Sequence, residues 1–264
     1  MGLPLFDVGD DPGPSFDRFL EVSGRPVTFS SRSIETPHAT TVVAVRSRDG
    51  VVLVGDRQAT GAYIASRDVR KIEPADSHSA IAISGSAAMG MEFIRLVQLS
   101  FEHYEKMTDS SLSLEGKANY ISPLIQRNNL TTPFPVLPLL AGFDTSRKVG
   151  RVFEYDGAGG CYERDDFVTI GSGTPFAESA LRMGFKVDMS IDEAIDLAAL
   201  AVYEAGDNDP STGGPDFVRG IFPMIVKVDI DGFAEIDDGE TERRFRSIQD
   251  RRTASGGRAG SDLR

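Results

Sequence analysis

Three residues of this chain have side chains that together could activate a nucleophile: Thr40, Asp56 and Lys71. A threonine hydroxyl inside a chain is a poor nucleophile. A threonine at a chain's N-terminus carries its own base, the α-amino group, with an ordinary pKa of about 8. A nearby lysine lowers the pKa of that amine and of the hydroxyl, and an acid can hold the lysine in place. Thr40 is therefore a candidate latent nucleophile, provided that the 39 residues before it are cut away.

Spacing in the sequence cannot by itself make these three residues neighbours. Taken singly, a threonine in a strand is far more often structural than catalytic. Asp56, which precedes Arg57, would ordinarily be a solvated acid, and Lys71 a surface charge. The elements around them therefore have to be predicted before the chemistry can be weighed.

The composition limits the classes of protein to consider. With 264 residues, of which 40% are hydrophobic and 26% charged, the chain can form one large core plus terminal segments. Its net charge of −12 argues against a nucleic-acid binder, which needs a basic surface to contact phosphates. A single cysteine, Cys161, and three scattered histidines offer neither a disulfide nor a zinc-type spacing, so we expect no metal and no cofactor.

The hydrophobic pattern predicts an α+β fold. Strands are expected at residues 41–45, 51–54, 80–83, 136–143, 149–155, 167–170, 221–228 and 233–236. Helices are expected around residues 93–104 and 113–129, from a cap at Thr174, and from a capping box at Ser190 through residue 205. The run at residues 41–45 is apolar on both faces, which is typical of a strand covered on both sides. Along the chain the expected order is strands, two helices, strands, two helices and strands. Since each pair of helices needs one face of a sheet, this order fits a four-layer helix–sheet–sheet–helix (αββα) sandwich.

Both ends of the chain differ from this central region. Residues 1–39 contain a breaker cluster at residues 9–14 and a possible short helix at residues 15–22, which we interpret as a docking segment. They lack a basic region followed by an apolar run, so we expect a cytoplasmic protein without a membrane span. The catalytic region is then residues 40–238, and residues 239–264, charged and without apolar periodicity, are expected to be a flexible, disordered tail.

Five motifs carry a family resemblance. They are Thr40-Thr41-Val42-Val43, Gly55-Asp56-Arg57, Arg67-Asp68-Val69-Arg70-Lys71, Gly171-Ser172-Gly173 and Asp209-Pro210-Ser211-Thr212-Gly213-Gly214. Their order and spacing resemble those of proteasome β subunits over about residues 40–236, and residues 213–223 are similar to the actinobacterial version. The resemblance implies the αββα fold of N-terminal-nucleophile hydrolases, in agreement with the layers predicted above.

The resemblance also implies a role for each candidate residue. Thr40 would be the nucleophile, Lys71 would tune its pKa with Asp56 as partner, and the Gly85 N–H would stabilise the oxyanion. Hydrogen bonds around the threonine amine would come from Ser172, Asp209 and Thr212. Thr60 would pair with the substrate backbone. Ala59, Val69, Ile83 and Ala87 would line an apolar pocket for the residue before the scissile bond, which predicts chymotrypsin-like cleavage.

Maturation and partners follow from the same resemblance. Autocatalytic cleavage between Ala39 and Thr40 would leave 225 residues (264 − 39), and Ala39 stands where most relatives have glycine, which predicts slower processing. The expected assembly contains heptameric rings of β subunits flanked by rings of α subunits, fed with unfolded, tagged proteins by a ring ATPase. Two alternatives stay open: a subunit of the simpler HslV-type peptidase, and a β subunit that builds the ring without cutting.

Overall fold

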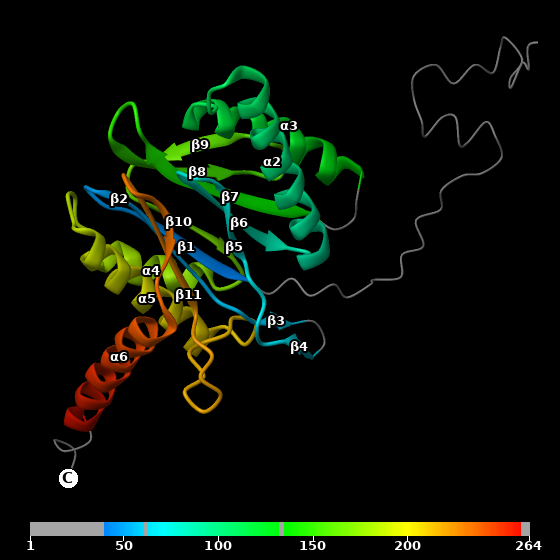
Figure 1. Cartoon of the computed structure of the whole chain (residues 1–264). Coiled ribbons are helices and arrows are strands. Elements are labelled where there is room, and N and C mark those ends of the chain that lie inside the picture. The colour runs from blue at the N-terminus through cyan, green and yellow to red at the C-terminus, as the bar shows by residue number, and fades with distance from the viewer. Residues whose placement is uncertain (1–39, 61–62, 132–134, 260–264) are drawn as a thin grey trace, which may run out of the picture. The chain divides into compact units, whose positions relative to one another are not determined.

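Two antiparallel sheets stack face to face between two layers of helices (Figure 1). The computed structural model describes residues 40–60, 63–131 and 135–259. The first sheet has the order β10 (Phe167–Gly171), β1 (Thr41–Arg46), β2 (Gly50–Gly55), β11 (Met224–Asp229) and β12 (Gly232–Glu235). The second has the order β5 (Ile72–Asp76), β6 (Ser79–Gly85), β7 (Val136–Asp144), β8 (Val149–Tyr155) and β9 (Cys161–Arg164). The four layers predicted from the sequence are confirmed.

The central strands β1 and β2 are apolar on both faces because each face meets a different core. In β1, Val43 and Val45 pack toward α4 (Thr174–Gly184) and α5 (Ile191–Asn208), while Val42 and Ala44 pack toward the second sheet. All four are fully buried. Since successive side chains point to opposite faces, a two-sided apolar run requires the helix layer that is observed.

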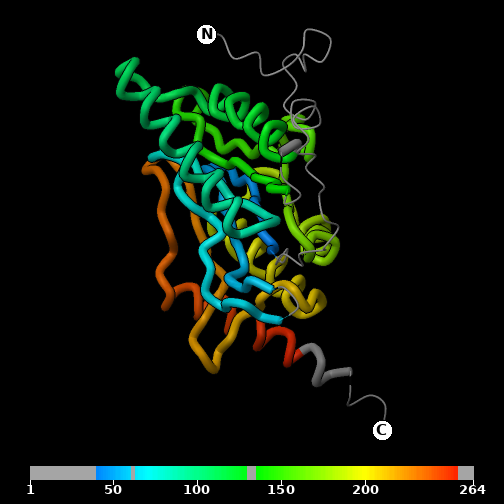
Figure 2. The backbone as a smooth tube through the Cα atoms, turned by 90° about the vertical axis from the view of Figure 1, so that its right-hand side faces the viewer, coloured from blue at the N-terminus to red at the C-terminus, as the bar shows by residue number. Residues whose placement is uncertain are grey.

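The second sheet is covered by α2 (Ala87–Thr108) and α3 (Leu114–Thr131), as the turned view also shows (Figure 2). One apolar cluster contains Ile81 and Ile83 of β6, Val97 of α2, and Ile121 and Ile125 of α3. Among the described residues, no helix combines the length and the apolar character needed to cross a bilayer.

The structure confirms one predicted helix cap, corrects another and adds strands that were not predicted. The capping box is present, since the Ser190 Oγ accepts from the Glu193 N–H (3.3 Å) and Glu193 Oε2 accepts from the Ser190 N–H (2.8 Å). The cap of α4, however, is Gly173, and Thr174 is already helical. The short hairpin of β3 (Ala59–Thr60) and β4 (Ile64–Ser66), together with β5 and β9, was not predicted. The predicted helix at residues 15–22 lies outside the described residues.

The prediction of a disordered segment after Asp238 is wrong for residues 238–259, which form helix α6 (Asp238–Ala259). Phe245 and Ile248 are buried in the same core as α4 and α5. Ion pairs add to this contact. Arg244 reaches Asp192 and Asp196, both at 2.8 Å, and Arg252 reaches Glu204 at 2.6 Å. Two apolar residues among many charges give no visible periodicity, so the helix is stabilised by tertiary contacts that the local pattern does not reveal.

Helix α6 also contacts the long loop that joins α5 to β11. The ring of Phe245 stacks on that of Phe222, with centroids 6.4 Å apart, and Phe222 meets Phe217 edge to face at 5.3 Å. The Arg246 guanidinium lies 5.2 Å from the centroid of the Phe217 ring. The two aromatic residues of the loop are therefore both held by the last helix.

The variant Phe245→Ala tests whether α6 is part of the folded core. Removing a fully buried phenylalanine should lower the free energy of unfolding by about 3–5 kcal/mol. Urea denaturation followed by circular dichroism measures this. The exposed Gln249→Ala on the same helix is the control, and we expect it to leave the unfolding midpoint unchanged. Equal midpoints for the two variants would mean that residues 238–259 behave as the flexible tail that the sequence suggested.

Candidate active site

Thr40 lies immediately before β1, at the end of the first sheet, and is buried with 5% of its surface exposed. Its carbonyl accepts a hydrogen bond from the Ser172 N–H at 3.0 Å. On the other side of the same peptide, the Thr41 N–H donates to Asp56 Oδ1 at 2.8 Å. A side chain at Gly171, which has φ +109°, would bring its Cβ to 1.6 Å from the Thr40 carbonyl oxygen, so this approach requires glycine. The peptide after Thr40 is thus fixed by strands on both sides.

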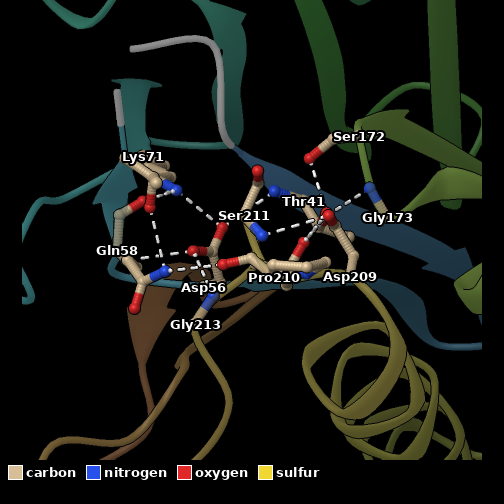
Figure 3. A network of polar contacts seen from close by, with 12 residues as sticks. Thr41, Asp56, Gln58, Lys71, Ser172, Gly173, Asp209, Pro210, Ser211 and Gly213 are labelled. Carbon is tan, nitrogen blue, oxygen red and sulfur yellow. Dashed lines mark hydrogen bonds and ion pairs between the residues drawn. The ribbon is translucent and has the colours of Figure 1, made fainter. Parts of the chain in front are cut away.

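Asp56 and Lys71 form a buried ion pair (Figure 3). Lys71 Nζ lies 2.6 Å from Asp56 Oδ1 and donates a second hydrogen bond to the Gln58 carbonyl at 2.5 Å. The other carboxylate oxygen, Asp56 Oδ2, accepts from the N–H groups of Gln58 (2.9 Å) and Gly213 (3.0 Å). The side chains of the pair are 4% and 0% exposed, so each charge is satisfied by protein groups. The structure brings together the acid and the lysine that the sequence could only place fifteen residues apart.

The surroundings of Lys71 act on its pKa in opposite directions. Burial, the largest effect, lowers the pKa of the ammonium below its ordinary value of 10.5. The charge of Asp56 and its hydrogen bond, and the charge of Asp209, raise it, and burial prevails. Lys71 therefore holds its proton less tightly than an exposed lysine does, in a position where its charge acts on neighbouring groups through little solvent.

Ser172 and Asp209, both labelled in Figure 3, form a second polar cluster together with Thr212. Asp209 Oδ2 accepts from the hydroxyls of Ser172 and Thr212, both at 2.6 Å, and Asp209 Oδ1 accepts from the Ser211 N–H at 3.1 Å. Asp209 stands at the C-terminal cap of α5, and Ser172 follows β10. The three residues that the sequence assigned to the surroundings of the threonine amine do form one cluster, beside the backbone of Thr40.

Gly85 ends β6, one residue before the Ser86 cap of α2. It has φ +103°, and a Cβ there would lie 2.2 Å from the Pro135 carbonyl oxygen, so only glycine fits. The first turn of α2 follows directly, and its unpaired N–H groups and dipole create a positive potential at this end of the sheet. A group that develops negative charge beside Gly85 would be stabilised there.

A small cavity opens beside Thr40, and four of the predicted pocket residues line it. Its lining residues are Thr40, Ala59, Val69, Arg70, Lys71, Ile83, Gly85, Ala87 and Met91. The walls away from the charged groups are mostly apolar. Thr60 is not among them, and its Oγ1 accepts a hydrogen bond from the Gln58 side-chain amide at 2.9 Å. No cluster of three or more potential metal ligands occurs among residues 40–60, 63–131 and 135–259.

Comparison with known proteins gives the family of this chain. A family model described as proteasome subunit matches residues 36–218. The chain belongs to the proteasome subunit family. A proteasome subunit beta of Acidimicrobium ferrooxidans is 43% identical over 250 residues, which cover 92% of this chain and 91% of the relative. Proteins of the same name from Streptomyces griseus and Stackebrandtia nassauensis are each 44% identical, over 83% and 85% of this chain and 79% and 83% of their own length.

Membership of the proteasome subunit family makes the chain a component of a protein-degrading hydrolase and agrees with the αββα sandwich. Some residues of this proteasome subunit's site were missed by sequence reasoning. Gln58, Thr41 and Gly173 contribute hydrogen bonds to the two clusters, and Met91 lines the cavity. Three of them stand within or beside the motifs quoted above. Met91 stands in no such motif. It lies in the first turns of α2, and only the folded structure shows that it lines the cavity.

The ion pair gives a stability prediction with a defined pH dependence. Asp56→Asn removes the carboxylate that is paired with the buried Lys71 ammonium, so the free energy of unfolding should fall by about 3–5 kcal/mol near neutral pH. Loss of the carboxylate lowers the pKa of Lys71 further. As the pH rises toward 10.5, the folded variant releases this proton before the unfolded chain does, and stability recovers.

Urea titrations at several pH values measure this effect, with the exposed Asp231→Asn as the control. We expect the difference between Asp56→Asn and wild type to shrink steadily as the solution becomes more alkaline. A difference that stays constant over the whole range would mean that the lost interactions are the backbone hydrogen bonds of Asp56 alone.

Proposed function

We propose that this chain is a catalytic β subunit of a 20S proteasome core, a threonine endopeptidase that hydrolyses peptide bonds of unfolded proteins. The observation that carries the proposal is the convergence of Thr40, Lys71 and Gly85 on one cavity, with the buried Asp56 behind the lysine. A buried ammonium that lines the same cavity as a threonine can lower the pKa of that threonine's amine and hydroxyl, which supports a catalytic role. The cytoplasm is the compartment that we propose for it.

In the proposed reaction, Thr40 is first exposed as an N-terminal residue by cleavage after Ala39. Its Oγ1 then attacks the substrate carbonyl carbon, and the α-amino group takes the hydroxyl proton through a water molecule. The tetrahedral oxyanion accepts a hydrogen bond from the Gly85 N–H, a contribution of about 3 kcal/mol in comparable sites. The amine returns the proton to the leaving nitrogen as the C–N bond breaks, which leaves an ester on Thr40. Water hydrolyses that ester by the same transfers.

The two polar clusters have separate roles in this proposal. Lys71, oriented by Asp56, acts through its positive charge to keep the pKa of the Thr40 amine and hydroxyl low. The cluster of Asp209, Ser172 and Thr212 orients the amine by hydrogen bonds. Ala59, Val69, Ile83 and Ala87 would receive an apolar side chain of the substrate, and Thr60, which lies outside the cavity, would pair with the substrate backbone.

Assembly is part of the proposed function. Heptameric rings of this subunit, flanked by rings of α subunits, would enclose the Thr40 sites so that only unfolded chains, delivered by a ring ATPase, reach them. While residues 1–39 are attached, Thr40 has no free amine and the subunit is a zymogen. A hexameric HslV-type ring without α subunits is the runner-up, and the mass of the native particle separates the two.

Self-cleavage is tested by the intact mass of the chain, expressed alone and with an α partner. Wild type should lose residues 1–39, leaving 225 residues (264 − 39), mainly when the partner is present. Thr40→Ala should keep the full length under both conditions, since it lacks the nucleophile. Cleavage of Thr40→Ala at the same bond would point to a foreign protease, and an uncut wild type in the complete particle would favour a subunit that builds the ring without cutting.

Occupation of the cavity by the substrate side chain gives a specificity prediction. Ala87→Leu narrows the cavity, so kcat/KM for peptides with Phe or Leu before the scissile bond should fall about 10–200-fold relative to peptides with Ala there. Fluorogenic peptides measure the ratio on assembled particles. The control, Ala158→Leu, adds the same volume at an exposed position in the turn between β8 and β9. An equal loss of kcat/KM for all peptides would show that the substitution disturbs the whole site, and would contradict the assignment of this cavity to the side chain before the scissile bond.

A further inference from the structure

Thr41, the residue after the proposed nucleophile, connects the two polar clusters of the site (Figure 3). Its N–H donates to Asp56 Oδ1 at 2.8 Å, which joins it to the ion pair with Lys71. Its hydroxyl lies 2.6 Å from the hydroxyl of Thr212, which joins it to the cluster around Asp209. Thr41 is completely buried, so these contacts are not shared with solvent. The backbone N–H of Thr41 thus contacts the Asp56–Lys71 pair, and its hydroxyl contacts the cluster around Asp209.

The direction of the hydrogen bonds can be worked out from the donors available. The Thr212 hydroxyl donates its one proton to Asp209 Oδ2, because an ionised carboxylate can only accept. Toward Thr41 it can therefore only accept, so the Thr41 hydroxyl is the donor in that contact. The Thr41 hydroxyl in turn accepts from the Gly173 N–H at 3.0 Å. A one-way chain runs from Gly173 through Thr41 and Thr212 to the carboxylate of Asp209.

The surroundings are shaped around this hydroxyl. A Cβ on Gly173 would lie 2.4 Å from Thr41 Oγ1 and 2.8 Å from Thr212 Oγ1, so a glycine is needed for the chain to form. Hydrogen bonds that follow one another in a buried chain polarise and strengthen one another, so removing one hydroxyl weakens the hydrogen bonds that remain. This chain of hydrogen bonds therefore fixes the side-chain rotamer of Thr41. Through the peptide bond between Thr40 and Thr41, it also restrains the backbone of Thr40.

We propose that Thr41 is a positioning residue for peptide hydrolysis: its hydroxyl locks the nucleophile's backbone to the Asp209 cluster while its N–H locks it to the Asp56–Lys71 pair. This inference rests on the proposed function, because it assumes that Thr40 is the nucleophile. Thr41 does not touch the substrate. It sets the distance and angle at which the Thr40 hydroxyl and amine meet the substrate carbonyl, where small displacements cost much of the rate.

The test compares variants of Thr41 in the complete particle, assembled with the α partner and measured with a fluorogenic peptide. Thr41→Val keeps the shape of the side chain and removes the hydroxyl, so kcat should fall about 10–100-fold while KM changes less than about two-fold. Thr41→Ser restores the hydroxyl and should recover most of kcat. Thr169→Val, in β10 opposite Val43, is the matched control and should match wild type.

A double variant tests whether the hydroxyls act as one chain. If they do, Thr41→Val combined with Thr212→Val should be no slower than the slower single variant, whereas independent residues would give multiplied losses. Thermal unfolding of each variant separates a loss of kcat from a loss of folded protein. If Thr41→Val fails to assemble, Thr41→Ser and Thr41→Ala, which differ only in the hydroxyl, decide by the same criterion.

The outcomes separate this inference from the proposed function. An active, Thr40-dependent wild type with an unchanged kcat in Thr41→Val would overturn the role of Thr41 and leave the proposed function standing. A wild-type particle without Thr40-dependent hydrolysis would overturn both. A lowered stability with a normal kcat per folded particle would reduce Thr41 to an ordinary core threonine and would also contradict the inference.

Discussion

The buried pair of Asp56 and Lys71 is the constraint on which the rest of the site depends. Two charges taken out of water are tolerated only when hydrogen bonds satisfy what remains of each group. Here those bonds come from Thr41, Gln58 and Gly213, which belong to different parts of the chain. Asp56 directly follows β2 in the first sheet and Lys71 directly precedes β5 in the second. The pair therefore fixes how the two sheets meet at the end where Thr40 lies.

The layers could be predicted because local patterns record them directly. The run at residues 41–45 is apolar on both faces, and Ser190 with Glu193 is a complete capping signal, so both could be interpreted without knowledge of the fold. Helix α6 could not be predicted in this way. Its position depends on Phe245 and Ile248 reaching a core built by distant residues, and on Arg244 meeting acids of α5. Short strands such as β3 and β4 carry too few residues to show a period.

The site could be predicted only in part, and for a physical reason. The pairing of Asp56 with Lys71 and the cluster around Asp209 followed from a family resemblance, since no spacing rule links residues held by separate strands and loops. The pairing of Thr60 with the substrate backbone stays a prediction, and in this structure the Thr60 hydroxyl accepts a hydrogen bond from the Gln58 side-chain amide. The connecting place of Thr41 was invisible in sequence, because its hydroxyl finds its partner 171 positions further along the chain.

The contact between α6 and the loop after α5 has a consequence for how this protein tolerates change. The same loop begins with Asp209, Thr212 and Gly213, which supply the site, and ends near Phe222, which lies against Phe245. Helix α6 and strand β1 thus both contact the loop between α5 and β11, α6 through Phe245 and β1 through Thr41. Deleting helix α6 is for that reason not expected to be neutral, since it removes the contacts that support a loop that catalysis would use.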